Sequence, residues 1–142
     1  MIFLDEKLVF QMKLQAEKSY PDECCGFIFG QIENDVRTAE FIKPAENTSD
    51  EGFHRFLITA EQMLKAEMYA SQRGVDIIGV YHSHPDCKAT PSEYDRSHAL
   101  PVYSYIIVSS VKGKAEDFFS WQRDKNSDYK NFTREEIRYK GE

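Results

Sequence analysis

The stretch VDIIGVYHSH, residues 75–84, predicts a central β-strand, because it is apolar and rich in β-branched residues. Pro85 follows it directly and ends the run. His82 and His84 stand at the end of this strand, one residue apart. Side chains alternate across a strand, so these two imidazoles project from one face and Ser83 from the other. A pair of histidines placed in this way calls for a reason beyond packing.

Elements of both kinds surround this strand. Asp5 can cap a first helix, and Thr59 with Gln62 forms a capping box for a second. Gly26 and Gly30 fall in an expected strand, where a close backbone approach is predicted. Further strands are expected at 25–32, 36–43, 53–59, 102–110 and 116–123, with a short third helix at 92–100 and an edge-strand candidate near 135–139 in the polar tail 125–142. Strands interleaved with helices predict an α/β domain over residues 1–142, with a central mixed β-sheet flanked by helices.

Composition excludes several classes of function. The formal charge of −6 and the pI near 5.3 argue against nucleic acid or an anionic membrane as partner, since both need a basic surface. No apolar run approaches the roughly 20 residues of a membrane span. The three cysteines make a poor disulfide framework, because two of them are adjacent. With no basic segment at the N-terminus, a cytoplasmic protein with reduced thiols is expected.

The histidine pair suggests a metal site. Two neutral imidazoles at this spacing suit zinc, which binds nitrogen at about 2.0–2.1 Å and needs a third protein ligand plus an open position for catalysis. Asp95 is the best third candidate, because the loop turns back at Pro91 and Asp95 falls on the first turn of the next helix. Ser92 with Asp95 is equally typical of a helix capping box. The pattern alone leaves both readings open, and both roles can hold at once.

Other metal-site patterns fit less well. Metallo-β-lactamase-like hydrolases use His-x-His-x-Asp-His, and Cys87 stands where the last histidine belongs. Nucleobase deaminases need His-x-Glu followed by Pro-Cys-x-x-Cys, whereas the adjacent cysteines here precede the histidines. A cupin would place a carboxylate sooner after His84. These alternatives are disfavoured.

Two segments together resemble the JAMM (MPN-plus) metallopeptidases. HSHPDCKATPSEYD, residues 82–95, matches the family's His-x-His-Pro and Ser-x-x-Asp, and YPDECCGFIFG, residues 20–30, matches its early glutamate, here Glu23. The loop with Asn47 is also similar, so the resemblance covers about residues 5–111. It implies a cytidine deaminase-like JAB/MPN fold. It also implies one zinc ion per chain, held by His82, His84 and Asp95.

The resemblance also assigns two catalytic roles. Glu23 is the general base, which takes a proton from the zinc-bound water without ligating the metal. Ser92 helps to stabilise the oxyanion, a task suited to a positioned donor. Without the resemblance, Glu23 would be interpreted as a solvated loop residue and Ser92 as a helix cap.

The implied substrate is a protein tail. The chain has little spare length after Asp95 for the second insertion of ubiquitin-chain-cleaving members, and its compact form resembles the bacterial branch that acts on ubiquitin-like sulfur carrier proteins. Those enzymes hydrolyse an amide at the carrier's C-terminal Gly-Gly. A deubiquitinase-like isopeptidase, a small-molecule metallohydrolase and a non-catalytic MPN scaffold stay open as alternatives. The sequence does not predict the oligomeric state.

Other histidines and cysteines are assigned ordinary roles. His54 and His98 are expected to be polar positions without a ligand function. Cys24 and Cys25 are expected to be small buried groups. Cys87 lies in the loop beside the histidines, where it could modulate access to a metal.

Overall fold

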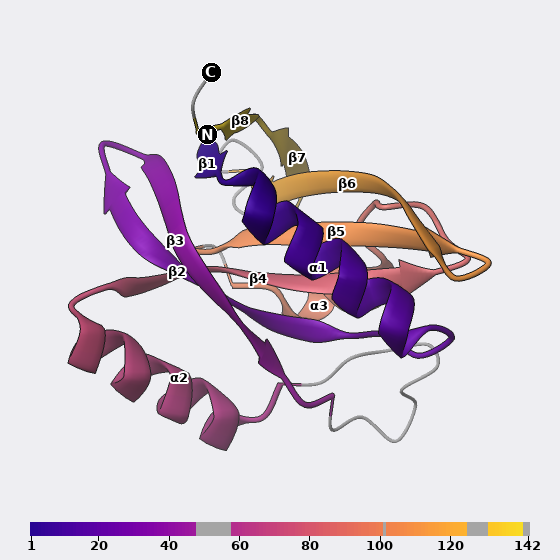
Figure 1. Ribbon diagram of the computed structural model, residues 1–142. Helices are drawn as coiled ribbons and strands as arrows, with labels where there is room; N and C mark the ends of the chain where they lie inside the picture. The colour runs from indigo at the N-terminus through magenta and orange to yellow at the C-terminus, as the bar shows by residue number, and fades with distance from the viewer. Residues whose placement is uncertain (48–57, 101, 125–130, 141–142) are drawn as a thin grey trace.

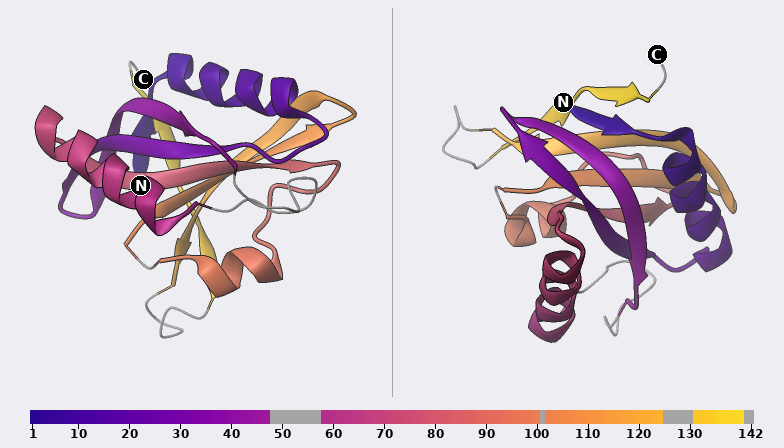
Figure 2. Two further views of the ribbon diagram at one scale, coloured as in Figure 1. Left: turned by 90° about the horizontal axis from the view of Figure 1, so that it is seen from below. Right: turned by 60° about the vertical axis from the view of Figure 1, so that its left-hand side comes forward.

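The computed structural model describes residues 1–47, 58–100, 102–124 and 131–140. Its centre is an eight-stranded mixed sheet in the order β7-β6-β5-β4-β2-β3-β1-β8. The elements are β1 (Ile2–Leu4), α1 (Glu6–Ser19), β2 (Cys25–Glu33), β3 (Val36–Ala45), α2 (Ala60–Arg73), β4 (Asp76–Pro85), α3 (Glu93–His98), β5 (Ser104–Val111), β6 (Lys114–Arg123), β7 (Phe132–Glu135) and β8 (Ile137–Tyr139). Helix α1 covers one face of the sheet, and α2 and α3 lie on the other (Figures 1 and 2). This is the α/β arrangement predicted from the sequence.

Helix α1 begins where its cap predicts. The Asp5 carboxylate accepts a hydrogen bond from the amide of Lys7 at 2.8 Å, which satisfies one of the otherwise unpaired donors of the first turn. The buried residues of the helix recur at helical spacing and are Leu8, Val9, Met12 and Ala16. They form one core cluster with side chains of β4 and β5, including Ile78, Tyr81, Ile106 and Val108. This cluster fixes α1 against the middle of the sheet.

Helix α2 has the predicted signals at both ends. Thr59 and Gln62 form the full capping box, and Gly74 ends the helix in the left-handed conformation at φ 68°. Its buried residues, Ala66 and Ala70, belong to a second cluster on the opposite face of the sheet from α1. Small residues at these two positions let the helix lie close to β2 and β4.

Strand β4 lies in the middle of the sheet, parallel to β5 and antiparallel to β2. Nearly all of its residues after Asp76 are buried, which explains the continuous apolar run in the sequence. Gly26 and Gly30 of β2 allow the close approaches that the sequence predicts. A Cβ at Gly26 would overlap the ring of Tyr81, and one at Gly30 would overlap the carbonyl of Thr38.

Two short strands extend the sheet beyond the expected set. Strand β8 is the predicted edge strand near residue 137, whereas β1 and β7 have no counterpart in the sequence prediction. Strand β1 pairs in parallel with both β3 and β8, so the chain start lies between segments distant in sequence. The strand expected at 53–59 falls mostly outside the described residues. None of the helices in the described part of the chain is long and apolar enough to cross a membrane.

Candidate metal centre

The two histidines lie at the C-terminal end of β4 and project toward α3. His82 is 1% exposed and His84 is 8% exposed. Their ring centroids are 4.8 Å apart, and the two Nε2 atoms are separated by 3.0 Å. Because side chains alternate along a strand, both imidazoles lie on the same side of β4 with their Nε2 atoms close together, as the spacing predicts.

Asp95 completes this group from the first turn of α3. Its Oδ1 lies 3.2 Å from Nε2 of His82, and its Oδ2 lies 3.1 Å from Nε2 of His84. The capping box holds the carboxylate in place, because the amide of Ser92 donates to Asp95 Oδ2 at 2.8 Å and Ser92 Oγ accepts from the Asp95 amide at 3.1 Å. The hydrogen bonds that begin α3 are thus the same ones that orient the Asp95 carboxylate.

The loop after β4 fixes the orientation of His84. Its Nδ1 lies 2.9 Å from the carbonyl oxygen of Lys88, so this nitrogen carries a proton and donates it. In the neutral ring the other nitrogen, Nε2, then carries the lone pair that a metal ion needs. Three consecutive carbonyls of the loop are held by side chains of three strands: Cys87 by Ser109 Oγ at 2.6 Å, Lys88 by His84, and Ala89 by Trp121 Nε1 at 3.0 Å. The sequence carries no signal for these loop contacts.

The electrostatics of the centre favour a cation. Burial lowers the pKa of His82 despite the nearby charge of Asp95. Burial alone would also lower the pKa of His84, but the hydrogen bond and charge of Asp95 and the Lys88 carbonyl raise it. Burial would raise the pKa of Asp95, but the two imidazoles and the Ser92 amide hold it well below its usual range. Asp95 is therefore held as an anion beside both imidazole rings.

This donor set fits a tetrahedral zinc ion. Ligand atoms at about 2.0–2.1 Å from a tetrahedral centre lie about 3.3 Å from one another. The Nε2 atoms of His82 and His84 are 3.0 Å apart, and each lies 3.1–3.2 Å from one oxygen of the Asp95 carboxylate, so the spacing of the donors is close to this value. Two imidazole nitrogens and one carboxylate oxygen are also the ligand types that zinc takes in catalytic sites. His82, His84 and Asp95 are thus the residues that would hold the ion.

Glu23 reaches the same point from the segment between α1 and β2. It is 6% exposed, and one of its oxygens and the ring nitrogens of His82 and His84 all lie within 4.8 Å of one another. It places a second buried carboxyl group at the centre. The structure therefore brings together all four residues that the sequence singled out on β4, α3 and the early loop. Ser92 lies at the rim with its side chain exposed.

The remaining predicted positions lie apart from this chemistry. Cys24 and Cys25 are buried free thiols, as predicted, and Cys87 is an exposed free thiol in the loop beside His84. His54 is outside the described residues. Among contacts that sequence reasoning missed, Ser83 and Cys24 are joined by two hydrogen bonds, although 59 residues separate them. No local pattern predicts such a pair.

Residues 5–124 match the family described as prokaryotic homologues of the JAB domain, which is most of the chain. The chain belongs to this prokaryotic JAB family. A relative named desampylase, from Pyrococcus furiosus, is 31% identical over 117 residues, covering 82% of this chain and 80% of that protein. The resemblance to JAMM proteins that the two sequence segments indicate is confirmed.

Solved structures agree with membership of the JAB family. A protein from Desulfitobacterium hafniense is 29% identical and superimposes with a TM-score of 0.85, covering 100% of this chain and 94% of that one. A JAB1/MPN domain protein from Archaeoglobus fulgidus is 19% identical, with a TM-score of 0.57 and coverage of 97% and 96%. The second likeness concerns the fold alone, and it confirms the predicted JAB/MPN architecture.

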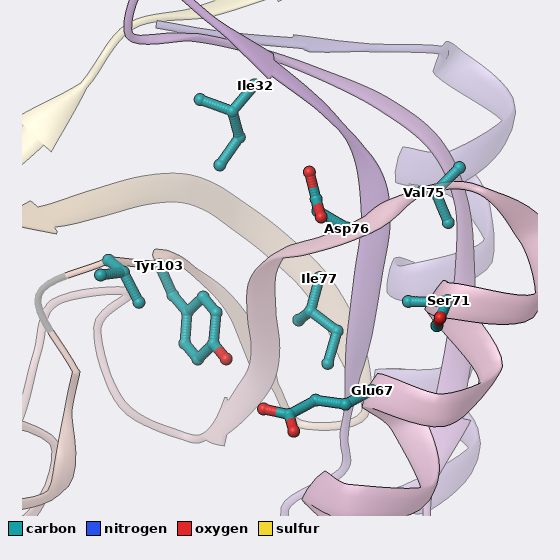
Figure 3. Close-up of a pocket in the computed structure, with 9 residues that line it drawn as sticks. Ile32, Glu67, Ser71, Val75, Asp76, Ile77 and Tyr103 are labelled. Carbon is teal, nitrogen blue, oxygen red and sulfur yellow. The ribbon is translucent and has the colours of Figure 1, made fainter.

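Two open pockets flank α2 on this JAB domain. The larger, about 430 Å³, lies at the opposite end of β4 from the histidines, and Glu67, Asp76 and Tyr103 line it together with apolar side chains (Figure 3). The smaller, about 220 Å³, lies where β3 ends and α2 begins, with Phe27 and Lys43 in its wall. Only the smaller one is near the segment that carries Glu23, because the side chain of Asn47, just after β3, donates to the Glu23 carbonyl at 3.1 Å.

Proposed function

We propose that this protein is a zinc-dependent hydrolase that cuts the amide or isopeptide bond after the C-terminal Gly-Gly of a ubiquitin-like protein. The observation that carries the proposal is the convergence of two imidazole nitrogens and a carboxylate within 3.0–3.2 Å, with Glu23 beside them. Family membership favours the same chemistry.

His82, His84 and Asp95 hold the metal in this proposal. A zinc ion bound there supplies a Lewis acid and lowers the pKa of a bound water toward about 7. The chain's own contribution is to present three ligand atoms already in place. His84 is fixed in the ligating tautomer by the Lys88 carbonyl, and Asp95 is fixed by the Ser92 amide.

Glu23 acts as the general base. Its carboxylate accepts a proton from the attacking water and passes it to the departing amine, a role that accounts for roughly 10²–10⁴-fold in such reactions. Ser92 donates to the oxyanion that forms at the scissile carbonyl. Its Oγ accepts from the Asp95 amide, and a serine hydroxyl that accepts one bond still has its own hydrogen to donate. Capping and oxyanion stabilisation are therefore compatible in Ser92.

The edge of β3 supports a protein tail as substrate. Among the described strands, β1 pairs with β3 only at Arg37 and Thr38, which leaves the second half of β3 open on that side. Ala45 pairs with Cys25, which pairs with His82, so this edge lies two strand spacings, about 10 Å, from the centre. An extended tail adding to this edge would pass the pocket at Phe27 and Lys43 on its way to the metal.

The relative named desampylase favours a ubiquitin-like partner, because that name denotes a hydrolase of ubiquitin-like protein conjugates. We favour a sulfur carrier protein, from which the enzyme would release cysteine or a short peptide. The chain is compact between Asp95 and β5, which leaves little room for the second insertion that the resemblance would lead one to expect in a ubiquitin-chain-cleaving member. Three free thiols fit a reducing compartment such as the cytoplasm.

Intact mass spectrometry tests the proposal directly. The zinc-loaded protein is incubated with ubiquitin-like carriers that end in Gly-Gly extended by cysteine or by a dipeptide, and with diubiquitin. We expect one carrier to shorten to its Gly-Gly end, and Glu23→Gln to abolish this. Cleavage of diubiquitin alone would point to the isopeptidase alternative. No shortening of any protein, with zinc bound, would overturn the proposal and favour a small-molecule substrate or a binding scaffold.

A further inference from the structure

One peptide group, that between Glu23 and Cys24, is held at both of its polar ends. Its carbonyl, on Glu23, accepts a hydrogen bond from Asn47 Nδ2 at 3.1 Å. Its amide, on Cys24, donates to Ser83 Oγ at 2.9 Å. A peptide group is planar and its carbonyl and amide point in opposite directions, so two such bonds fix its rotation about the chain. The direction in which Glu23 leaves the backbone is fixed with it.

Ser83 is the residue between the two histidines of β4. Its side chain is fully buried and lies on the opposite side of the strand from the imidazoles. The Ser83 amide also donates to the Cys24 carbonyl at 3.1 Å, which closes a two-bond contact between these residues. Strand β4 presents His82 and His84 on one face. Through Ser83, the residue between them, the same strand holds the segment that carries Glu23 by two hydrogen bonds.

We propose that Ser83, assisted by Asn47, is a positioning residue that aims the Glu23 carboxylate at the metal centre. This inference rests on the proposed function, in which Glu23 is the base. Among the described residues, the Ser83 hydroxyl is hydrogen-bonded to the Cys24 amide, and it lies on the opposite side of β4 from the nitrogens that would ligate the metal. Its effect is to hold the distance and angle between the base and the two imidazoles, and a shift of about 1 Å in such a group can cost 10²-fold in rate.

Satisfying a buried amide is also a structural task, so the test needs readouts that separate the two roles. The zinc-loaded Ser83→Ala variant is compared with wild type on a ubiquitin-like protein ending in Gly-Gly-dipeptide. We expect kcat to fall about 10- to 100-fold with KM within about twofold, and zinc to stay at one per chain. Ser83→Thr, which keeps the hydroxyl, should restore most of kcat.

Ser110→Ala is the matched control. Ser110 is a fully buried serine on the neighbouring strand β5, and its hydroxyl has no hydrogen-bond partner in the described part of the chain. We expect wild-type kcat in this variant. Because Ser83 acts through Glu23, adding Ser83→Ala to Glu23→Gln should cause no further loss. An equal loss in both backgrounds, or an unchanged kcat in Ser83→Ala alone, would overturn the inference.

Hydrogen exchange supplies a readout independent of activity. In metal-free protein the Cys24 amide should be protected by Ser83 Oγ, and Ser83→Ala should raise its exchange rate at least tenfold while the amides of β5 keep theirs. Unaltered exchange at Cys24 would overturn the inference even if the enzyme is active. Wild-type protein that binds zinc but hydrolyses no carrier would overturn the proposed function, and with it the role of Ser83 in aiming a base.

Discussion

Ser109 Oγ lies 2.6 Å from the carbonyl oxygen of Cys87, one residue before the carbonyl that fixes His84. Ser109 also pairs with His84 across β4 and β5. Ser109 therefore supports the histidine in two ways, through the strand pairing and through its hydrogen bond to the loop. Together with Trp121 at Ala89, this bond makes the loop after β4 a rigid support for a ring that must present one particular nitrogen. The orientation of the metal centre is thus set from β5 and β6 as well as from β4.

Ser109→Ala is expected to weaken zinc binding by roughly three- to tenfold, because losing a partner that orients a ligating histidine commonly costs 10–100-fold and Ser109 acts one step further out. Competition with a chromophoric chelator measures the affinity. Ser110→Ala, the next residue on the strand, is the control and should leave the affinity unchanged. Equal affinities in all three proteins would show that the loop does not depend on this bond.

Removal of a ligand should remove the metal. His82→Ala and Asp95→Asn are expected to reduce zinc from one per chain to well below a tenth under chelator competition, because each leaves two protein ligands of the three. Glu67→Gln, a carboxylate change in the larger pocket at the other end of β4, is the matched control (Figure 3). Elemental analysis of dialysed protein checks this, and full zinc retention in Asp95→Asn would remove Asp95 from the ligand set.

Glu23→Gln separates the base from the ligands. If Glu23 is the base, the variant keeps one zinc per chain and loses roughly 10²–10⁴-fold in kcat, since an amide does not accept the proton. Zinc content and turnover of a Gly-Gly-extended carrier are measured on the same sample. Loss of zinc in this variant would instead make Glu23 a ligand, a role that its place near both imidazoles also allows.

Local chemistry made much of this fold predictable. Asp5 marks the start of α1 and Thr59 with Gln62 that of α2, and the apolar run of β4 marks the central strand with its histidines. The short strands β1 and β7 were not predicted, since three or four residues carry too little pattern. Their pairing partners lie far away in sequence, so only the closed sheet defines them.

The candidate site likewise has one part that the sequence predicts and another that it does not. The spacing of His82, His84 and Asp95 predicted which side chains meet, because strand alternation and a helix cap are local rules. The contacts that hold these residues in position are not local. Cys24 meets Ser83 across 59 residues, and the Lys88 carbonyl that fixes His84 is a backbone atom with no signature in the sequence.

Gly30 of β2 is expected to be far less tolerant than Gly74. A Cβ at Gly30 would overlap the Thr38 carbonyl of the paired strand, so Gly30→Ala should lower the free energy of unfolding by about 3 kcal/mol or more. A Cβ at Gly74 meets nothing within 4 Å, and Gly74→Ala should cost only about 1 kcal/mol for its left-handed conformation. Urea unfolding of both variants measures the difference, and equal losses would contradict the close strand approach.

The three thiols should differ sharply in reactivity. Burial raises the pKa of Cys25 to about 12 and also raises the pKa of Cys24, whereas Cys87 is exposed. At pH 8 roughly one Cys25 in ten thousand would be a thiolate, so iodoacetamide should reach Cys87 alone in the native protein. Mass spectrometry should find one adduct on the folded chain and three in denaturant. Because the thiolate fraction grows tenfold per pH unit below the pKa, any slow labelling of Cys25 should rise with pH, and rapid native labelling of Cys24 or Cys25 at pH 8 would mean that the segment carrying Glu23 opens to solvent.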